Sequence, residues 1–182
     1  MSVHTGVGTG LKERLTDGSL AGRWQLDPAR STVKLSTKSM WGLVPVKGTF
    51  AQVRGEGRVD PDGVITGRLT VGAGSLDTRN KKRDEHLLGG DFFSASTYPE
   101  ITFDLTGAEV RRPGLDLSGR LTVGAQTRPI AFAASFNLDG DREVAIDAEI
   151  VIDRSDYGLS WNRMGATSMK NTITLHTVFV IA

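Results

Sequence analysis

The sequence contains no cysteine, which excludes disulfide bonds and thiolate chemistry. It also has no excess of charge of one sign, because 22 Lys and Arg residues stand against 21 Asp and Glu residues. A protein that binds nucleic acid through a strongly basic surface is therefore not expected. No apolar run reaches the roughly 18 residues that a membrane-spanning helix needs, so we expect no membrane span.

The first 22 residues lack the apolar segment of a secretory signal peptide, which favours a cytoplasmic protein. They are rich in Gly, Ser and Thr, and they have no sustained hydrophobic period. We therefore expect residues 1–22 to form a flexible tail, with a brief helical turn around Leu11 to Leu15 as the alternative, and residues 23–182 to form a single domain. A domain of that length buries enough surface to fold around its own core.

Most of the remaining chain alternates between apolar and polar residues, which is the period of a half-buried β-strand. The segment 65–71, ITGRLTV, is typical, and similar segments recur to give eight or nine strands. Helices do not alternate with these strands, so an all-β, antiparallel fold is predicted. Antiparallel strands in that number either close into a barrel or stack as a sandwich.

Glycine is abundant, with 22 residues, and its placement bears on that choice. Gly48, Gly67 and Gly119 fall on the apolar face of their strands, where a packed sandwich would place larger residues. In a barrel such glycines permit strong coiling and leave volume inside, so they favour a barrel with an apolar cavity. The alternative is that they mark β-bulges around a filled interior.

One short segment breaks the strand pattern and predicts a helix around residues 80–88. Asn80 is a suitable N-cap, a glycine pair follows Leu88, and the residues between include no proline, glycine or β-branched residue. This helix carries a dense group of polar side chains, Arg83, Asp84 and His86. They could tie the helix to the barrel rim, contact a ligand headgroup, or act in acid–base catalysis.

The segment Met40–Pro45 is apolar without alternation, and its proline disfavours a central strand position. An apolar loop of this kind is expected either to contact a second copy in a dimer or to cover a ligand entrance.

No serine or cysteine nucleophile with a matching base is recognisable, so an enzyme is not expected. The three histidines, His4, His86 and His176, are too scattered to form a metal site.

Several short motifs occur in an order that resembles the YceI-like family, and they extend from Trp24 to Ile181. They are Trp24-Gln25-Leu26-Asp27-Pro28, Gly48-Thr49-Phe50, Ser75-Leu76-Asp77-Thr78, Arg83-Asp84-Glu85-His86-Leu87, Asp91-Phe92-Phe93, Tyr98 to Phe103, Gly119 to Val123, and Arg154 with Tyr157-Gly158-Leu159.

That resemblance implies an extended, lipocalin-like antiparallel β-barrel of about eight strands with one short helix inserted around residues 80–88. It also implies a carrier or store for a long-chain isoprenoid lipid, of the prenyl quinone or polyprenyl phosphate type, and a homodimer. No cofactor is expected beyond such a bound lipid or quinone. The alternatives are an enzyme that modifies or isomerises an apolar substrate inside the barrel, and a stress-related interaction module whose barrel is filled.

Two groups of residues are expected to form the binding site. The side chains expected at the headgroup or rim are Asp77, Arg83, Asp84, His86 and Arg154. Those expected to line the apolar interior are Leu35, Trp41, Phe50, Leu69, Val71, Phe92, Ile101, Phe103, Leu121, Phe132, Phe136, Ile150, Ile173 and Phe179.

Overall fold

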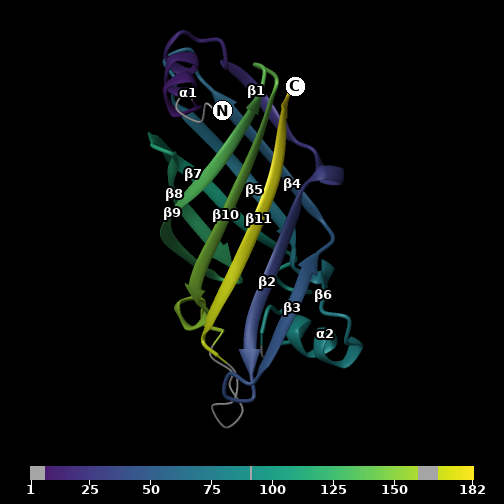
Figure 1. The fold of residues 1–182 in the computed structure, drawn as a ribbon. Helices are drawn as coiled ribbons and strands as arrows, with labels where there is room; N and C mark the ends of the chain where they lie inside the picture. Colours follow the sequence, from purple (N-terminus) through teal and green to yellow (C-terminus); the bar gives the residue numbers. More distant parts are fainter. Residues whose placement is uncertain (1–6, 91, 160–167) are drawn as a thin grey trace.

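The computed structural model describes residues 7–90, 92–159 and 168–182. Within them, strands make up most of an elongated body that has one α-helix at each end (Figure 1). The helices are α1 (Val7–Thr16) and α2 (Lys81–Leu88). The strands are β1 (Gly22–Leu26), β2 (Thr32–Ser39), β3 (Val44–Phe50), β4 (Val53–Val59), β5 (Ile65–Gly72), β6 (Leu76–Asp77), β7 (Glu100–Arg111), β8 (Gly114–Val123), β9 (Gln126–Asp139), β10 (Glu143–Asp153) and β11 (Lys170–Ile181).

Eight of these strands form a closed antiparallel barrel in the order β1-β4-β5-β7-β8-β9-β10-β11. The ring closes where β1 pairs with the last residues of β11, with Trp24 opposite Ile181. Because apolar and polar residues alternate, each strand turns one apolar face toward the inside of the ring; β8, for example, buries every second residue along much of its length. The predicted all-β barrel of about eight strands is confirmed.

The barrel is extended at the α2 end by a second set of strands. After β1, a 3-10 turn (Pro28–Arg30) interrupts the pairing with β11, and β2 then pairs with the preceding part of β11. β3 pairs with β2, and its far edge pairs only briefly with β6, at Thr49 and Phe50. At this end α2 lies beside β3 and β6 (Figure 1).

The predicted helix at residues 80–88 is confirmed as α2. The side chain of Asn80 accepts a hydrogen bond from the backbone N–H of Arg83, which satisfies a donor in the first turn. The backbone N–H of Gly89 donates to the carbonyl of His86 at the other end. The caps that were recognisable in the sequence therefore fix both ends of this helix.

The prediction of a flexible tail over residues 1–22 is wrong for its described part. Helix α1 occupies Val7–Thr16, and Leu11, Leu15 and Leu20 are all buried. Leu11 and Leu15 are one helical turn apart, so they share the face that packs against the barrel end. A short helix with little intrinsic stability is held by this tertiary burial, and the sequence does not show which surface it packs against. Residues 1–6 lie outside the described residues.

The apolar segment near residue 40 forms the tip of the β2–β3 hairpin. Met40 and Trp41 have positive φ angles of 49° and 55°, and the chain reverses there. Pro45 lies within β3 and pairs with Lys38, on the part of the strand whose other edge carries no partner strand among the described residues. The side chains at the tip are exposed, and Leu43 reaches 80%.

Candidate functional site

The barrel encloses an apolar cavity of about 250 Å³ at the α2 end. Inward-facing residues of the strands form most of its wall, and Leu87, Phe92 and Phe93 close it on the side of α2. Strands β3 and β7 are not paired with each other, and residues of α2 and of the segment after it complete the wall at this end. We refer to it as the α2-end cavity.

The polar part of the wall is built around Thr78. Its hydroxyl donates to Oδ1 of Asp84 at 2.5 Å, and its backbone N–H donates to the same carboxylate at 3.1 Å. Arg83 donates from Nε to the Thr78 hydroxyl and from Nη2 to the Thr78 carbonyl, both at 2.8 Å. These contacts hold the guanidinium of Arg83 at the cavity wall.

A second guanidinium, that of Arg154, borders the same cavity from the far end of β10. The residue is only 2% exposed, and it donates to the carbonyls of Leu159 and Ser168 at 2.6 and 3.0 Å. Its guanidinium carbon lies 5.2 Å from the ring centroid of Phe92. Burial lowers the pKa of Arg154 below its ordinary value, yet a guanidinium stays charged in proteins. A buried cation therefore faces an otherwise apolar space.

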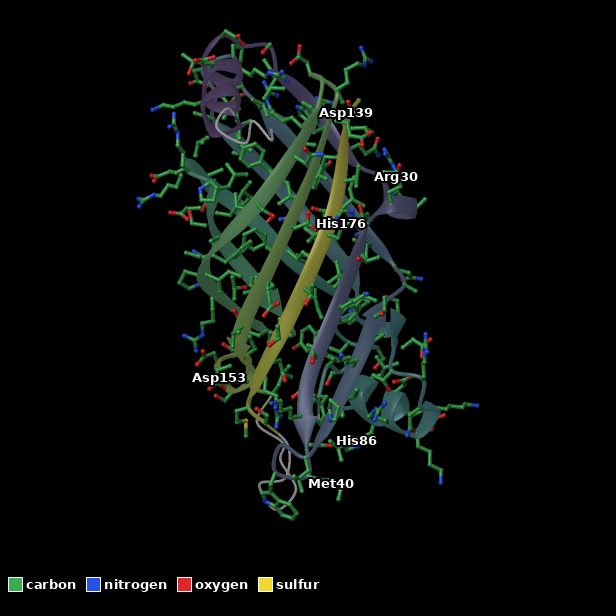
Figure 2. The ribbon with its side chains drawn as sticks, in the orientation of Figure 1. Arg30, Met40, His86, Asp139, Asp153 and His176 are labelled. Atoms are coloured by element: carbon green, nitrogen blue, oxygen red, sulfur yellow. The ribbon has the colours of Figure 1, made fainter. Side chains whose placement is uncertain are left out.

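His86 completes this polar end of the cavity. It lies one helical turn after Arg83, and its ring makes an edge contact with Phe92 at 5.5 Å. Figure 2 places His86 on α2, at the same end of the molecule as Met40 and far from Asp139. Tyr157 is also on the wall, and burial raises the pKa of its phenol, so the hydroxyl is neutral at ordinary pH.

A second apolar cavity, of about 160 Å³, occupies the α1 end of the barrel. Trp24 and Phe136 are on its wall, and Leu11, Leu15 and Leu20 cover its end. We refer to it as the α1-end cavity. The residues that border both cavities are Leu69, Phe103, Phe132 and Leu175.

All but one of the residues predicted to line the interior lie on a cavity wall, although their role in binding stays a prediction. Phe136 and Phe179 border the α1-end cavity, and Leu69, Phe103 and Phe132 border both. The α2-end cavity is bordered by Leu35, Phe50, Val71, Phe92, Ile101, Leu121, Ile150 and Ile173.

The prediction that Trp41 lines the interior is wrong. Trp41 is 69% exposed at the hairpin tip, beyond Ser39, the last residue of β2 on the cavity wall. The alternation of inward and outward side chains holds within a strand but not inside a turn. The pattern of β2 therefore could not predict which way the Trp41 side chain points.

Three of the five predicted rim residues, Arg83, His86 and Arg154, border the α2-end cavity, and two do not. Asp77 is exposed and accepts a hydrogen bond from the backbone N–H of Arg79 at 2.7 Å, while Asp84 binds Thr78. Both carboxylates therefore have structural roles. His176 lies on the outer surface, where Nδ1 is 2.6 Å from Asp147.

Sequence reasoning missed the part of the site that α1 contributes. The one available signal was the spacing of Leu11 and Leu15, which fits a helix face; the glycines around it masked that signal.

The described residues contain no cluster of three or more His, Cys, Asp or Glu side chains that could hold a metal ion. None of the helices described here is long and apolar enough to cross a membrane.

A sequence model of the YceI-like domain matches residues 24–180 of this chain. The chain belongs to the YceI-like family. Among its relatives, the UPF0312 protein SA2479 of Staphylococcus aureus (strain N315) is 28% identical over 145 residues, which cover 75% of this chain and 82% of that protein.

Solved structures share the fold of this YceI-like chain. BcnA of Burkholderia cenocepacia superposes with a TM-score of 0.75 at 23% identity, over 84% of this chain and 98% of that one. A polyisoprenoid binding domain from Saccharophagus degradans gives a TM-score of 0.70 at 15% identity, over 87% of this chain and 98% of that one. At these identities the likeness concerns the fold alone.

Proposed function

We propose that this protein binds and carries or stores a long-chain isoprenoid lipid of the prenyl quinone or polyprenyl phosphate type. The observation that carries the proposal is the α2-end cavity, which is apolar along the barrel and has its charged side chains, Arg83 and Arg154, at one end. Such an arrangement suits a molecule with one polar end and a long hydrocarbon tail.

Burial of the tail would supply most of the affinity. Apolar surface removed from water stabilises a complex by roughly 25 cal/mol per Å², so a long chain needs few polar partners. The wall around the tail consists of branched and aromatic residues, among them Ile101, Phe103 and Ile173, which can pack against methyl branches.

The headgroup would lie against α2. A phosphate or a quinone oxygen accepts hydrogen bonds, and Arg83 and His86 offer donors at the cavity wall. Thr78 binds Nε and Nη2 of Arg83, so Nη1 is the guanidinium nitrogen that would donate to a headgroup at the wall.

The family assignment supports this proposal, as does the similarity in fold to the domain of Saccharophagus degradans that is described as polyisoprenoid binding. The homodimer and the cytoplasmic location stay predictions.

The first experiment is to purify the full chain from its own host, extract it with organic solvent and analyse the extract by mass spectrometry. A stoichiometric isoprenoid is the expected result. An empty extract, together with no thermal stabilisation by added prenyl quinones, would overturn the proposal.

The headgroup position is tested with Arg83→Met and a matched control, Lys82→Met, on the exposed side of the same helix. We expect Arg83→Met to weaken binding of a prenyl phosphate roughly ten- to hundredfold, because hydrogen bonds to charged groups contribute about 1.5–3 kcal/mol. Binding of the prenyl alcohol of the same length should change little. Equal losses for both ligands would place the headgroup elsewhere.

A further inference from the structure

The two cavities are neighbouring parts of the barrel interior, and we call the wall residues that they share the waist. Leu69, Phe103, Phe132 and Leu175 border both of them. The rings of Phe103 and Phe132 form the centre of this waist, with centroids 5.4 Å apart and planes tilted by 52°. None of these four side chains is as buried as the residues of the packed core, because each borders both cavities.

That free volume matters for movement across the waist. A side chain in a filled core cannot change rotamer without displacing its neighbours. At the waist, either ring can turn into the adjoining cavity instead, so a hydrocarbon chain entering from the α2 end can part the rings. The waist is therefore a partition that a ligand can cross.

The α1-end cavity has a firm end wall. Leu11, Leu15 and Leu20 pack across it, and polar contacts fix the helix that carries the first two. Nη1 of Arg14 donates to the carbonyl of Gly140 at 2.6 Å and lies 3.0 Å from Oδ1 of Asp141.

Two further contacts hold this wall in place. The indole Nε1 of Trp24 donates to the carbonyl of Leu20 at 3.0 Å. On the other side, the turn at Gly63 approaches α1 so closely that a Cβ there would lie 3.0 Å from the carbonyl oxygen of Leu15. The β9–β10 turn and the β4–β5 turn thus fix α1, and β1 fixes Leu20 in the segment after it.

Helix α1 also lies outside the region that the YceI-like domain model matches, which begins at residue 24. The end wall therefore lies outside the matched domain region, although Trp24 behind it lies inside that region. Its position fits a role that concerns the far end of a ligand and not the headgroup, since Arg83 and His86 border the opposite cavity.

We propose that α1 sets the maximum length of the bound isoprenoid, with Leu11 and Leu15 as the specificity-determining residues and the Phe103–Phe132 ring pair as the partition that longer chains must cross. This inference rests on the proposed lipid-binding function. Small-molecule sites usually measure about 300–1,000 Å³, and the α2-end cavity alone falls below that range. With the α1-end cavity added, the interior reaches it.

The test uses the full chain and a series of prenyl alcohols: farnesol, geranylgeraniol, and the hexaprenyl, octaprenyl and decaprenyl alcohols. Trp24 reports on the α1-end cavity once Trp41→Phe and Trp161→Phe have left it as the only tryptophan. In this background we expect short alcohols to bind without changing Trp24 fluorescence, longer ones to change it, and affinity to stop rising at a limiting length.

The end wall is then opened with Leu11→Ser/Leu15→Ser, and Lys12→Ser/Glu13→Ser on the exposed side of α1 is the matched control. We expect the limiting length to increase and the affinity ratio of decaprenyl to geranylgeranyl alcohol to rise at least tenfold. The control should keep the wild-type length profile. An unchanged profile in the opened variant would overturn the inference and leave the proposed function intact, since the alcohols would still bind.

A third variant keeps the inference falsifiable if the opened protein does not fold. Phe132→Leu widens the waist without touching α1, and it should let geranylgeraniol change the fluorescence of Trp24. If Trp24 responds to no alcohol in any folded variant although the alcohols bind, the α1-end cavity holds no ligand and the inference is wrong. If no alcohol, quinone or phosphate binds at all, the proposed function itself is wrong.

Discussion

At the scale of single residues, Gly119 decides how closely β7 and β8 approach beside the waist. A Cβ at this position would lie 2.1 Å from the carbonyl oxygen of Asp104 and 2.7 Å from the ring of Phe103. Gly119 pairs with Leu105, next to the register shift between Leu105 and Gly107. The missing side chain therefore makes room for the Phe103 ring, which occupies part of the volume that the glycine leaves.

Gly119→Ala should accordingly destabilise the protein by about 1–3 kcal/mol, the usual cost of an overpacked core. It should also displace Phe103 from the waist. Urea unfolding measures the first effect, and the matched control is Gly74→Ala, where a Cβ would meet no atom within 4 Å. A loss of stability as small as that of the control would mean that β7 and β8 separate freely at this point.

At the scale of elements, side-chain hydrogen bonds join α2 to the rest of the α2-end wall. It has no fully buried residue, and Asp84 joins it to the end of β6 through the backbone and hydroxyl of Thr78. Few buried apolar contacts mean that such a helix can open without unfolding the barrel. The polar group on α2 therefore holds the wall of the α2-end cavity in place.

Asp84→Ala should increase amide hydrogen exchange in Lys81–Leu88 roughly tenfold or more, because about 1–3 kcal/mol of local stabilisation is lost. Exchange in the strands β8 to β10 should stay as in the wild type. Hydrogen-exchange mass spectrometry measures both, and Glu85→Ala, exposed on the same helix, is the control. Equal acceleration in the strands would mean that α2 and the barrel open as one unit.

At the scale of the whole molecule, Arg30 joins the 3-10 turn between β1 and β2 to the start of β10. Nη1 and Nη2 each lie 2.9 Å from an oxygen of Glu143, and Nε lies 2.8 Å from Oδ2 of Asp27. The hydrogen bond from Arg30 lowers the pKa of Asp27 below its ordinary value of 3.8. The same contacts, first that with Glu143, raise the pKa of Arg30.

The shift of Asp27 contributes to the pH dependence of stability. Because the pKa of Asp27 is lower in the folded state, the stabilisation is fully present above about pH 3.8 and is lost as the pH falls further. Arg30→Met should therefore be less stable at neutral pH, and its unfolding free energy should approach that of the wild type in acid. Urea unfolding between roughly pH 2 and 7 measures this, with Lys34→Met as control. Parallel curves would contradict the prediction.

Much of the fold could be predicted from the sequence because its signals are local. The period-two alternation of segments such as 65–71 gave the strands, and Asn80 with Gly89 gave the bounds of α2. The same parity placed Phe103, Phe132 and Phe179 on the interior. The glycines were a weaker guide to the cavity. Gly48 and Gly67 border the cavities, but a Cβ at Gly67 would lie 2.8 Å from the carbonyl oxygen of Glu56, so the close approach of the backbone explains this glycine.

By itself, the sequence determined most of the strands, the helix α2 and the side of those strands that faces inward, since these follow from neighbours along the chain. The short strand β6 was not predicted. Only the tertiary structure decided that Leu11 and Leu15 close one end of the barrel, that Phe103 meets Phe132, and that Trp41 points away from the interior. Each of these depends on surfaces far apart in the chain. A helix that is weak alone is stabilised by the barrel end it covers, and a cavity is the space left between walls contributed by many strands.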